Sequence, residues 1–139
     1  MRRLILAAAA AALLAVPAVA SSATKTYFPD CGSFTYKPKS GTIACGDGNF
    51  LFKSAKWSRW STKSATGKGK ASLNTCDPNC AQGKLKSYSA TIKLTKPHTC
   101  SGGVKAFGKI EIDFKRTPPT GYKKKYTQKL GCPAQQQQG

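Results

Sequence analysis

Acidic and catalytic side chains are scarce in this sequence. Of its 139 residues, five are aspartate or glutamate and one is histidine, against 23 lysines and arginines. Acid–base and nucleophilic catalysis need titratable groups within reach of one another. No Ser-His-Asp or Cys-His arrangement is recognisable in the sequence, so it does not point to a hydrolase of the common classes.

The chain also lacks a helical period, and it has no long apolar run after residue 20. Before that point, Arg2 and Arg3 precede an apolar stretch from Leu4 to Val16, and Ala18-Val19-Ala20 has the small residues of a cleavage site. This pattern predicts a signal peptide over residues 1–20 and export of the remainder. The apolar stretch is too short to span a bilayer comfortably, so we expect no transmembrane anchor.

The exported part is expected to be one domain. Removal of 20 of the 139 residues leaves 119, a length that buries roughly two-thirds of the surface of the unfolded chain. We predict a single secreted β domain over residues 21–134. The Gln-rich residues 135–139 are expected to form a disordered tail.

Glycine, proline, serine and threonine interrupt the exported part at the intervals typical of strands and turns. The expected strands are 33–37, 42–45, 50–60, 85–95 and 104–114. In the fourth of these, Ala90, Ile92 and Leu94 alternate with polar residues. In the fifth, the inward series is Ala106, Gly108, Ile110, Ile112 and Phe114. The predicted fold is all-β, a small antiparallel β-sandwich or curled sheet reinforced by disulfides. After Phe114 we expect an exposed segment.

Six cysteines in an exported chain predict three disulfides, for which 15 pairings exist. Chain order favours Cys31–Cys45, Cys76–Cys80 and Cys100–Cys132. The alternative is a structural zinc site at Cys76 and Cys80, although no second ligand pair has zinc-like spacing.

Basic charge dominates the exported part. Without Arg2 and Arg3, 21 basic residues face five acidic ones, a net charge near +16. Such an excess attracts polyanions without any specific site. Most of the basic residues are lysines, which favours a diffuse field over specific recognition of bases or phosphates. Two alternatives remain: a solubilising surface, or a functional basic patch.

The most informative candidate surface surrounds the two tryptophans. Trp57 and Trp60 are three residues apart, so on a regular strand they point to opposite faces. An exposed Trp60 would stack on a sugar or base beside a basic surface. The flanking basic residues are Lys56, Arg59, Lys63, Lys68 and Lys70. The alternative is that Trp60 covers the edge of the core.

Catalytic and metal sites have weaker signals. Glu111 and Asp113 share a strand face at a spacing that suits paired catalytic carboxylates, and His98 in an expected loop would serve as a general base. Their alternatives are a cross-strand charge pair with Lys93 and a plain surface histidine. Calcium would have Asp47, Asn49, Asp77 and Asn79 as oxygen ligands. Their spacing matches no calcium loop and suits turn formers better.

The central part of the chain carries a series of short motifs. They are Cys45-Gly46-Asp47-Gly48, Trp57-Ser58-Arg59-Trp60, Ala65-Thr66-Gly67-Lys68-Gly69, and Cys76-Asp77-Pro78-Asn79-Cys80-Ala81-Gln82-Gly83. With this series the chain resembles a group of small secreted actinobacterial proteins. The resemblance implies export and a Cys76–Cys80 loop, and it implies no catalytic residue.

These observations favour a secreted, non-enzymatic basic protein that binds anionic cell-envelope polymers or polysaccharide. We expect a monomer with no cofactor, no metal and no specific nucleic-acid partner. The alternative is a small secreted hydrolase that uses Glu111 and Asp113, or His98.

Overall fold

The computed structural model describes residues 24–133. The predicted signal peptide (1–20) and Gln-rich tail (135–139) lie outside the described residues. The strands are β1 (Thr26–Asp30), β2 (Ser33–Thr35), β3 (Gly41–Thr42), β4 (Phe50–Trp60), β5 (Ala65–Asn74), β6 (Leu85–Thr99), β7 (Lys105–Phe114) and β8 (Lys125–Lys129). A short 3-10 turn, η1 (Ser101–Gly103), joins β6 to β7.

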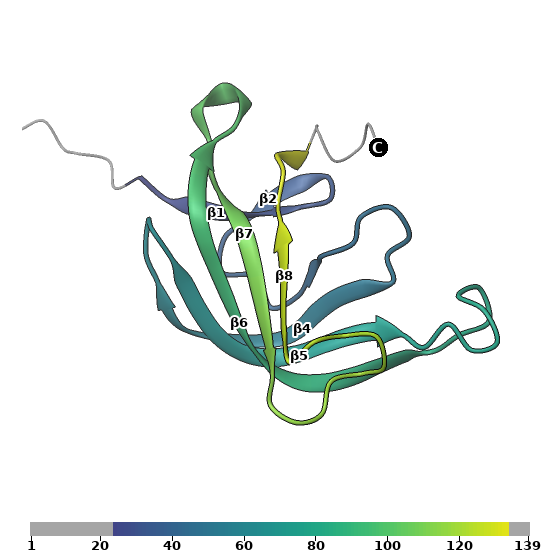
Figure 1. The fold of residues 1–139 in the computed structure, drawn as a ribbon. Coiled ribbons are helices and arrows are strands. Elements are labelled where there is room, and N and C mark those ends of the chain that lie inside the picture. The colour runs from purple at the N-terminus through teal and green to yellow at the C-terminus, as the bar shows by residue number, and fades with distance from the viewer. Residues whose placement is uncertain (1–23, 134–139) are drawn as a thin grey trace, which may run out of the picture.

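All eight strands belong to one sheet, which curls into a half-barrel (Figure 1). The order along the sheet is β2-β1-β7-β6-β5-β4-β3, and β8 adds to β7 beside β1. The predicted all-β class with a curled sheet is thus confirmed. Within residues 24–133, no helix is long and apolar enough to cross a membrane.

The core fills the concave side of the curl, and β6 and β7 form its centre. Ala90, Ile92 and Leu94 are buried as expected, and Ile112 and Ile110 lie directly opposite the latter two. The remaining large buried side chains include Phe28, Phe50, Phe52, Phe107 and Phe114. Burial of each such side chain contributes about 1.5–3 kcal/mol.

The inward series predicted for β7 is wrong at its first residues. Phe107, not Ala106, joins the main core, while Ala106 packs in a second small cluster with Cys100 and Cys132. The alternation of side chains changes at this point of β7, and Lys96 in the adjoining part of β6 has a left-handed φ of 52°. Phe107 and Ile110 therefore face the same core although they are three residues apart.

Two segments at the chain ends complete the sheet in ways that the sequence did not indicate. Residues Thr26 and Tyr27 of β1 pair in parallel with Lys105 and Ala106, within a sheet that is otherwise antiparallel. Residues 125–129 form β8, which pairs with β7. The prediction of an exposed segment throughout the chain after Phe114 is therefore wrong, since β8 covers one edge of the core.

Bulges in β4 decide where the two tryptophans point. The β4–β5 register shifts between Trp57 and Arg59, so Trp57 lies opposite Gly67 and Trp60 opposite Ala65, which is buried. The extra residue of the bulge shifts the alternation of side chains along β4 by one position. Trp57 and Trp60 therefore face the same side of the sheet although they are three residues apart. Both rings are half-buried against the core with centroids 4.7 Å apart. The expectation that they point to opposite faces is wrong.

Three disulfides reinforce the sheet: Cys31–Cys45, Cys76–Cys80 and Cys100–Cys132. These are the pairs that chain order favoured. Since both sulfurs of Cys76 and Cys80 are bonded to each other, neither is a thiolate available to zinc. The zinc alternative at these two residues is therefore wrong.

Candidate functional site: the outer lysine face

The outer face of β4 and β5 carries four lysines in two directly opposed pairs. In the antiparallel register Lys53 lies opposite Lys70, and Lys56 opposite Lys68. On either side of Lys68 and Lys70 along β5, Gly67 and Ala71 are buried, whereas the two lysines are exposed and therefore point outward. We call Lys53, Lys56, Lys68 and Lys70 the outer lysine face.

This arrangement costs stability. Directly opposed residues have Cβ atoms only about 4.5–5.5 Å apart, and like charges at such positions are destabilising. The next strand does not neutralise them, because β6 places Thr91 opposite Lys68 and Ser89 opposite Lys70. In these described pairings, no carboxylate lies directly opposite any of the four lysines. The face therefore presents concentrated positive charge to solvent.

The two acids of β7 belong to a different part of the outer surface. Glu111 lies opposite Lys93 on β6, and Asp113 lies opposite Lys125 on β8. Opposite charges facing each other across strands are favourable. This placement matches the cross-strand interpretation of Glu111 with Lys93.

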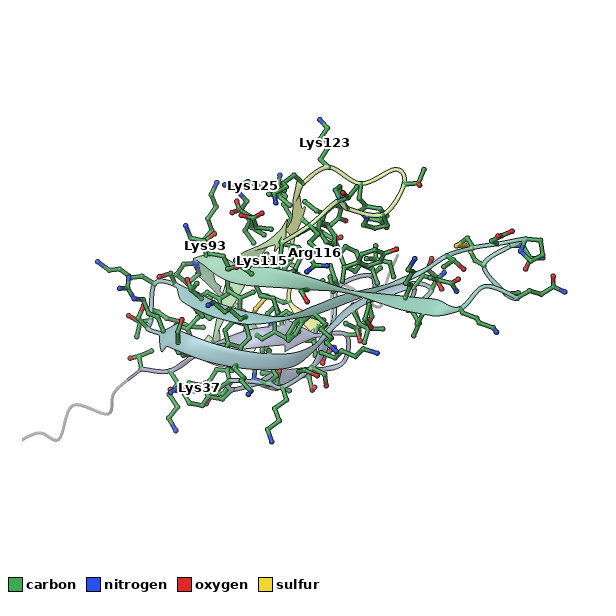
Figure 2. The ribbon with its side chains drawn as sticks, turned by 90° about the horizontal axis from the view of Figure 1, so that it is seen from below. Lys37, Lys93, Lys115, Arg116, Lys123 and Lys125 are labelled. Atoms are coloured by element: carbon green, nitrogen blue, oxygen red, sulfur yellow. A yellow bond between two sulfur atoms is a disulfide. The ribbon has the colours of Figure 1, made fainter. Side chains whose placement is uncertain are left out.

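Most other basic side chains are distributed around the molecule. Figure 2 shows Lys123 and Lys125 extending from one side and Lys37 from the opposite side. A diffuse positive field thus surrounds the domain. Lys109 and Lys129 form a further directly opposed pair across β7 and β8, whereas the outer lysine face holds two such pairs next to each other.

The structure separates the residues predicted to surround Trp60. Lys56, Lys68 and Lys70 lie on the outer face, as does Arg59 opposite Thr66. Lys63 lies in the turn between β4 and β5, where its N–H donates to Ser61 Oγ at 3.2 Å.

Trp60 itself points to the other side of the sheet. Its Nε1 donates to the Thr26 carbonyl at 3.0 Å, and its ring packs edge-on against Phe107 at 5.4 Å. The exposed tryptophan predicted beside these basic residues is therefore wrong, and the ring closes the edge of the core.

His98 lies near the end of β6 rather than in a loop, opposite Ala106. Its Nε2 is 3.3 Å from Cys132 Sγ and 3.6 Å from Cys100 Sγ. Glu111 is five residues beyond Ala106 along β7, a separation of roughly 17 Å. The structure thus does not bring His98 together with Glu111 and Asp113.

Metal binding would require free ligand atoms. Within residues 24–133, the one group of three His, Cys, Asp or Glu side chains close enough to share an ion is His98, Cys100 and Cys132, with atoms within 4.8 Å of one another. The disulfide between these two cysteines removes both thiolates. As it stands, the group offers a single imidazole nitrogen.

The four residues considered for calcium serve as turn formers where their contacts are known. Asp47 Oδ1 accepts from the Asn49 N–H at 3.0 Å, and this hydrogen bond lowers the pKa of Asp47. Asn79 Oδ1 accepts from the Gln82 N–H at 3.0 Å. These contacts fit the turn interpretation.

No protein-family model, curated protein or solved structure matches this chain. The resemblance to small secreted actinobacterial proteins therefore stays a prediction.

Sequence reasoning missed several residues that shape the surface. It did not single out Lys53, because only the register shows that Lys53 faces Lys70. It also missed the exposed Tyr36, whose ring has the Lys25 and Lys37 ammonium groups at 5.2 and 5.5 Å. Tyr36 packs edge-on against Trp60, on the side of the sheet away from the outer lysine face.

Proposed function

We propose that this protein is a secreted, basic, non-enzymatic domain that binds an anionic polymer of the cell envelope or extracellular space through the outer lysine face. It acts as a monomer. The observation that carries the proposal is the direct opposition of Lys53 to Lys70 and of Lys56 to Lys68. A bound polyanion offsets the repulsion between these pairs and releases its own counterions.

The compartment limits the choice of polymer. The signal-peptide pattern of residues 1–20 and three disulfides both favour an oxidising space outside the cytoplasm. Polyanions in such a space include wall-linked phosphate polymers and acidic polysaccharides. Nucleic acid is a poorer candidate, since the four residues of the face are lysines and Arg59 is the single arginine of β4 and β5, whereas specific reading of guanine favours arginine.

The structure permits a matched test of this surface against the diffuse field. One variant changes the outer lysine face to glutamine at all four positions (Lys53, Lys56, Lys68 and Lys70). The control variant changes four exposed lysines on separate elements to glutamine (Lys39, Lys84, Lys105 and Lys123). Both variants lose the same net charge.

Retention on purified cell wall and on immobilised acidic polysaccharide is then measured across a salt series. We expect the unmodified protein to stay bound above physiological salt, where the Debye length is about 8 Å. The outer-face variant should elute much earlier, and the control should elute close to the unmodified protein. Equal losses in the two variants would show that net charge alone is responsible. Elution of the unmodified protein at physiological salt would refute the proposal.

A further inference from the structure

A second site lies beyond the end of β7, where β6 continues with β5 as its remaining neighbour. The Lys115 N–H donates to the Ser89 carbonyl at 2.9 Å, and beyond this bond the chain turns away from β6 before β8 begins. Residues 85–88 therefore pair only with β5 on one side. We call the space between this part of β6 and the segment 116–122 the fork.

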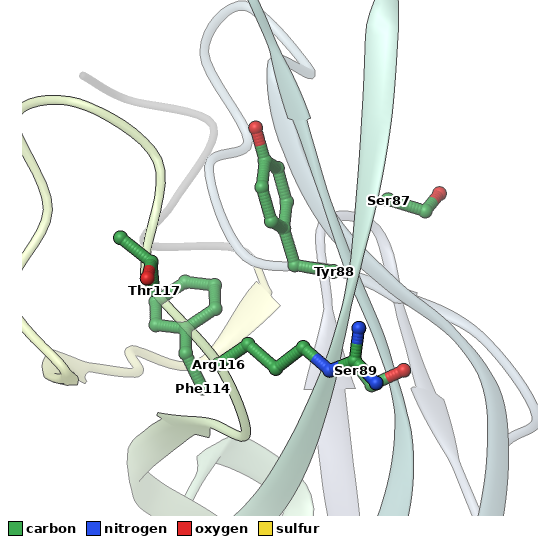
Figure 3. A pocket seen from close by; sticks show the side chains of 6 residues that line it. All are labelled: Ser87, Tyr88, Ser89, Phe114, Arg116 and Thr117. Carbon is green, nitrogen blue, oxygen red and sulfur yellow. The ribbon is translucent and has the colours of Figure 1, made fainter.

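Two adjoining depressions occupy the fork and share Tyr88 between them. The first has a volume of about 290 Å³ and is lined by Ser87, Tyr88, Ser89, Phe114, Arg116 and Thr117 (Figure 3). The second, of about 180 Å³, is lined by Leu73, Asn74, Thr75, Lys86, Tyr88, Pro119, Thr120 and Tyr122. Ligand pockets have volumes of about 300 Å³ or more, so the two depressions together can hold a small ligand or one unit of a polymer.

The lining combines one planar cationic side chain, that of Arg116, with hydroxyl groups. Arg116 supplies a planar guanidinium with five N–H donors, which matches a carboxylate in a bidentate fashion. Ser89 and Thr117 each add a hydroxyl that both donates and accepts. Lys86 contributes an ammonium in the second depression. Among residues 24–133, none of those that line either depression is acidic.

Aromatic rings form the walls between these polar groups. Tyr88 is half-buried and packs edge-on against Phe114, with ring centroids 6.1 Å apart. Tyr122 is held in the same way against Phe114 at 6.4 Å. Both tyrosines are thereby fixed in place, and a ring that presents an apolar body and a polar tip suits a pyranose, which has apolar C–H faces and a hydroxyl rim.

We propose that the fork binds an acidic sugar residue, with Arg116 holding its carboxylate and Tyr88 stacking on its ring. This inference rests on the proposed function and deepens it, because it identifies the anionic polymer as a polysaccharide of uronic acid type. The outer lysine face then supplies long-range attraction, while the fork recognises a single unit. A phosphate polymer without pyranose rings would bind the outer lysine face and could pair with Arg116, but it would leave Tyr88 without a stacking partner.

Arg116 is exposed, as is its neighbour Lys115, so the two positions form a matched pair for a test. The unmodified protein, Arg116→Gln, Arg116→Lys and Lys115→Gln are titrated with a uronic-acid tetramer, by calorimetry and by amide NMR shifts. The tetramer of the corresponding neutral sugar and a tetramer of deoxythymidine serve as comparison ligands.

We expect the uronic-acid tetramer to bind and to shift the amides of Ser87, Tyr88 and Ser89. Arg116→Gln should weaken binding about 10- to 100-fold, the cost of lost hydrogen bonds to a charged group. Arg116→Lys should bind more tightly than Arg116→Gln but more weakly than the unmodified protein, because an ammonium point charge replaces the planar guanidinium. Lys115→Gln should change the affinity less than about threefold, as expected for a charge outside the site.

Several outcomes would overturn the inference. They are absence of tetramer binding, equal weakening by Arg116→Gln and Lys115→Gln, equal affinity for the neutral tetramer, or tighter binding of the oligonucleotide. These outcomes are distinguishable from failure of the proposed function, because polymer retention is measured with the four-lysine variants, in which Arg116 is intact.

Discussion

Trp60 Nε1 donates a hydrogen bond to the carbonyl oxygen of Thr26 at 3.0 Å, and this bond ties β4 to β1 across the open side of the curled sheet. Thr26 is itself buried, and its Oγ1 donates to the Thr62 carbonyl at 2.9 Å. The end of β4 and the turn after it are thus fastened to the first strand. This contact joins β1 to β4, although the described strands include no backbone pairing between the two.

Replacement of Trp60 by phenylalanine should therefore reduce stability and leave polymer binding intact. The Thr26 carbonyl loses its donor, and the smaller ring keeps only part of the contact with Phe107, which together cost about 2–4 kcal/mol. Urea unfolding of W60F measures the loss, and retention on acidic polymer is the control. An unchanged free energy of unfolding would show that the Trp60–Thr26 bond is not structurally important.

Lys68→Glu should have opposite effects on stability and on binding. The new carboxylate lies opposite Lys56, so a repulsive cross-strand pair becomes attractive, a gain of about 0.5–1 kcal/mol at low salt. The same change removes positive charge from the outer lysine face and should lower the salt concentration at which the protein elutes from acidic polymer. Lys123→Glu, an exposed loop position, is the control and should leave both properties nearly unchanged. Loss of stability in K68E would contradict the proposed repulsion.

Alkaline pH should destabilise the domain through Tyr122 and Tyr126. Burial raises the pKa of both tyrosines above the usual 10.0, with further contributions from Asp47 to Tyr122 and from Tyr122 to Tyr126. A folded-state pKa above the unfolded value means that the stabilisation is complete below about pH 10 and is lost as the pH rises through the folded pKa.

Thermal unfolding between pH 8 and pH 11 tests this dependence, with Tyr122→Phe as the comparison. Because Y122F cannot ionise at this position, its stability should fall less steeply above pH 10 than that of the unmodified protein. The difference between the two proteins removes the shared effect of lysine deprotonation. Parallel curves would exclude a contribution from Tyr122.

The three disulfides should differ in their contribution to stability according to the length of chain that they enclose. Their sequence separations are 4, 14 and 32 residues for Cys76–Cys80, Cys31–Cys45 and Cys100–Cys132. The chain-entropy relation gives losses of about 2, 3 and 4 kcal/mol, respectively, when each pair is replaced by alanine. Urea unfolding of the three double variants gives the order, and the reverse order would indicate that native-state packing dominates.

The amino-acid sequence was sufficient for properties that depend on composition and local alternation. The even cysteine count and the order of the cysteines along the chain led to the observed disulfide pairs, and the interpretation of Asp47 and Asn49 as turn formers followed from local chemistry. The strand over residues 50–60 and the inward series Ala90, Ile92 and Leu94 were also predictable, because side chains on a regular strand alternate between two faces.

Features that depend on register and on contacts between distant segments were decided only by the tertiary structure. Bulges in β4 place Trp57 and Trp60 on one face, and the left-handed Lys96 in β6 accompanies the turn of Phe107 into the core. The sequences of β8 and of the parallel strand β1 show little alternation of apolar and polar residues. These segments are recognised as strands by their pairing with β7. The outer lysine face and the fork at Arg116 arise because strand register brings residues from separate strands together. Alternation within one strand does not specify which residues of two strands become partners.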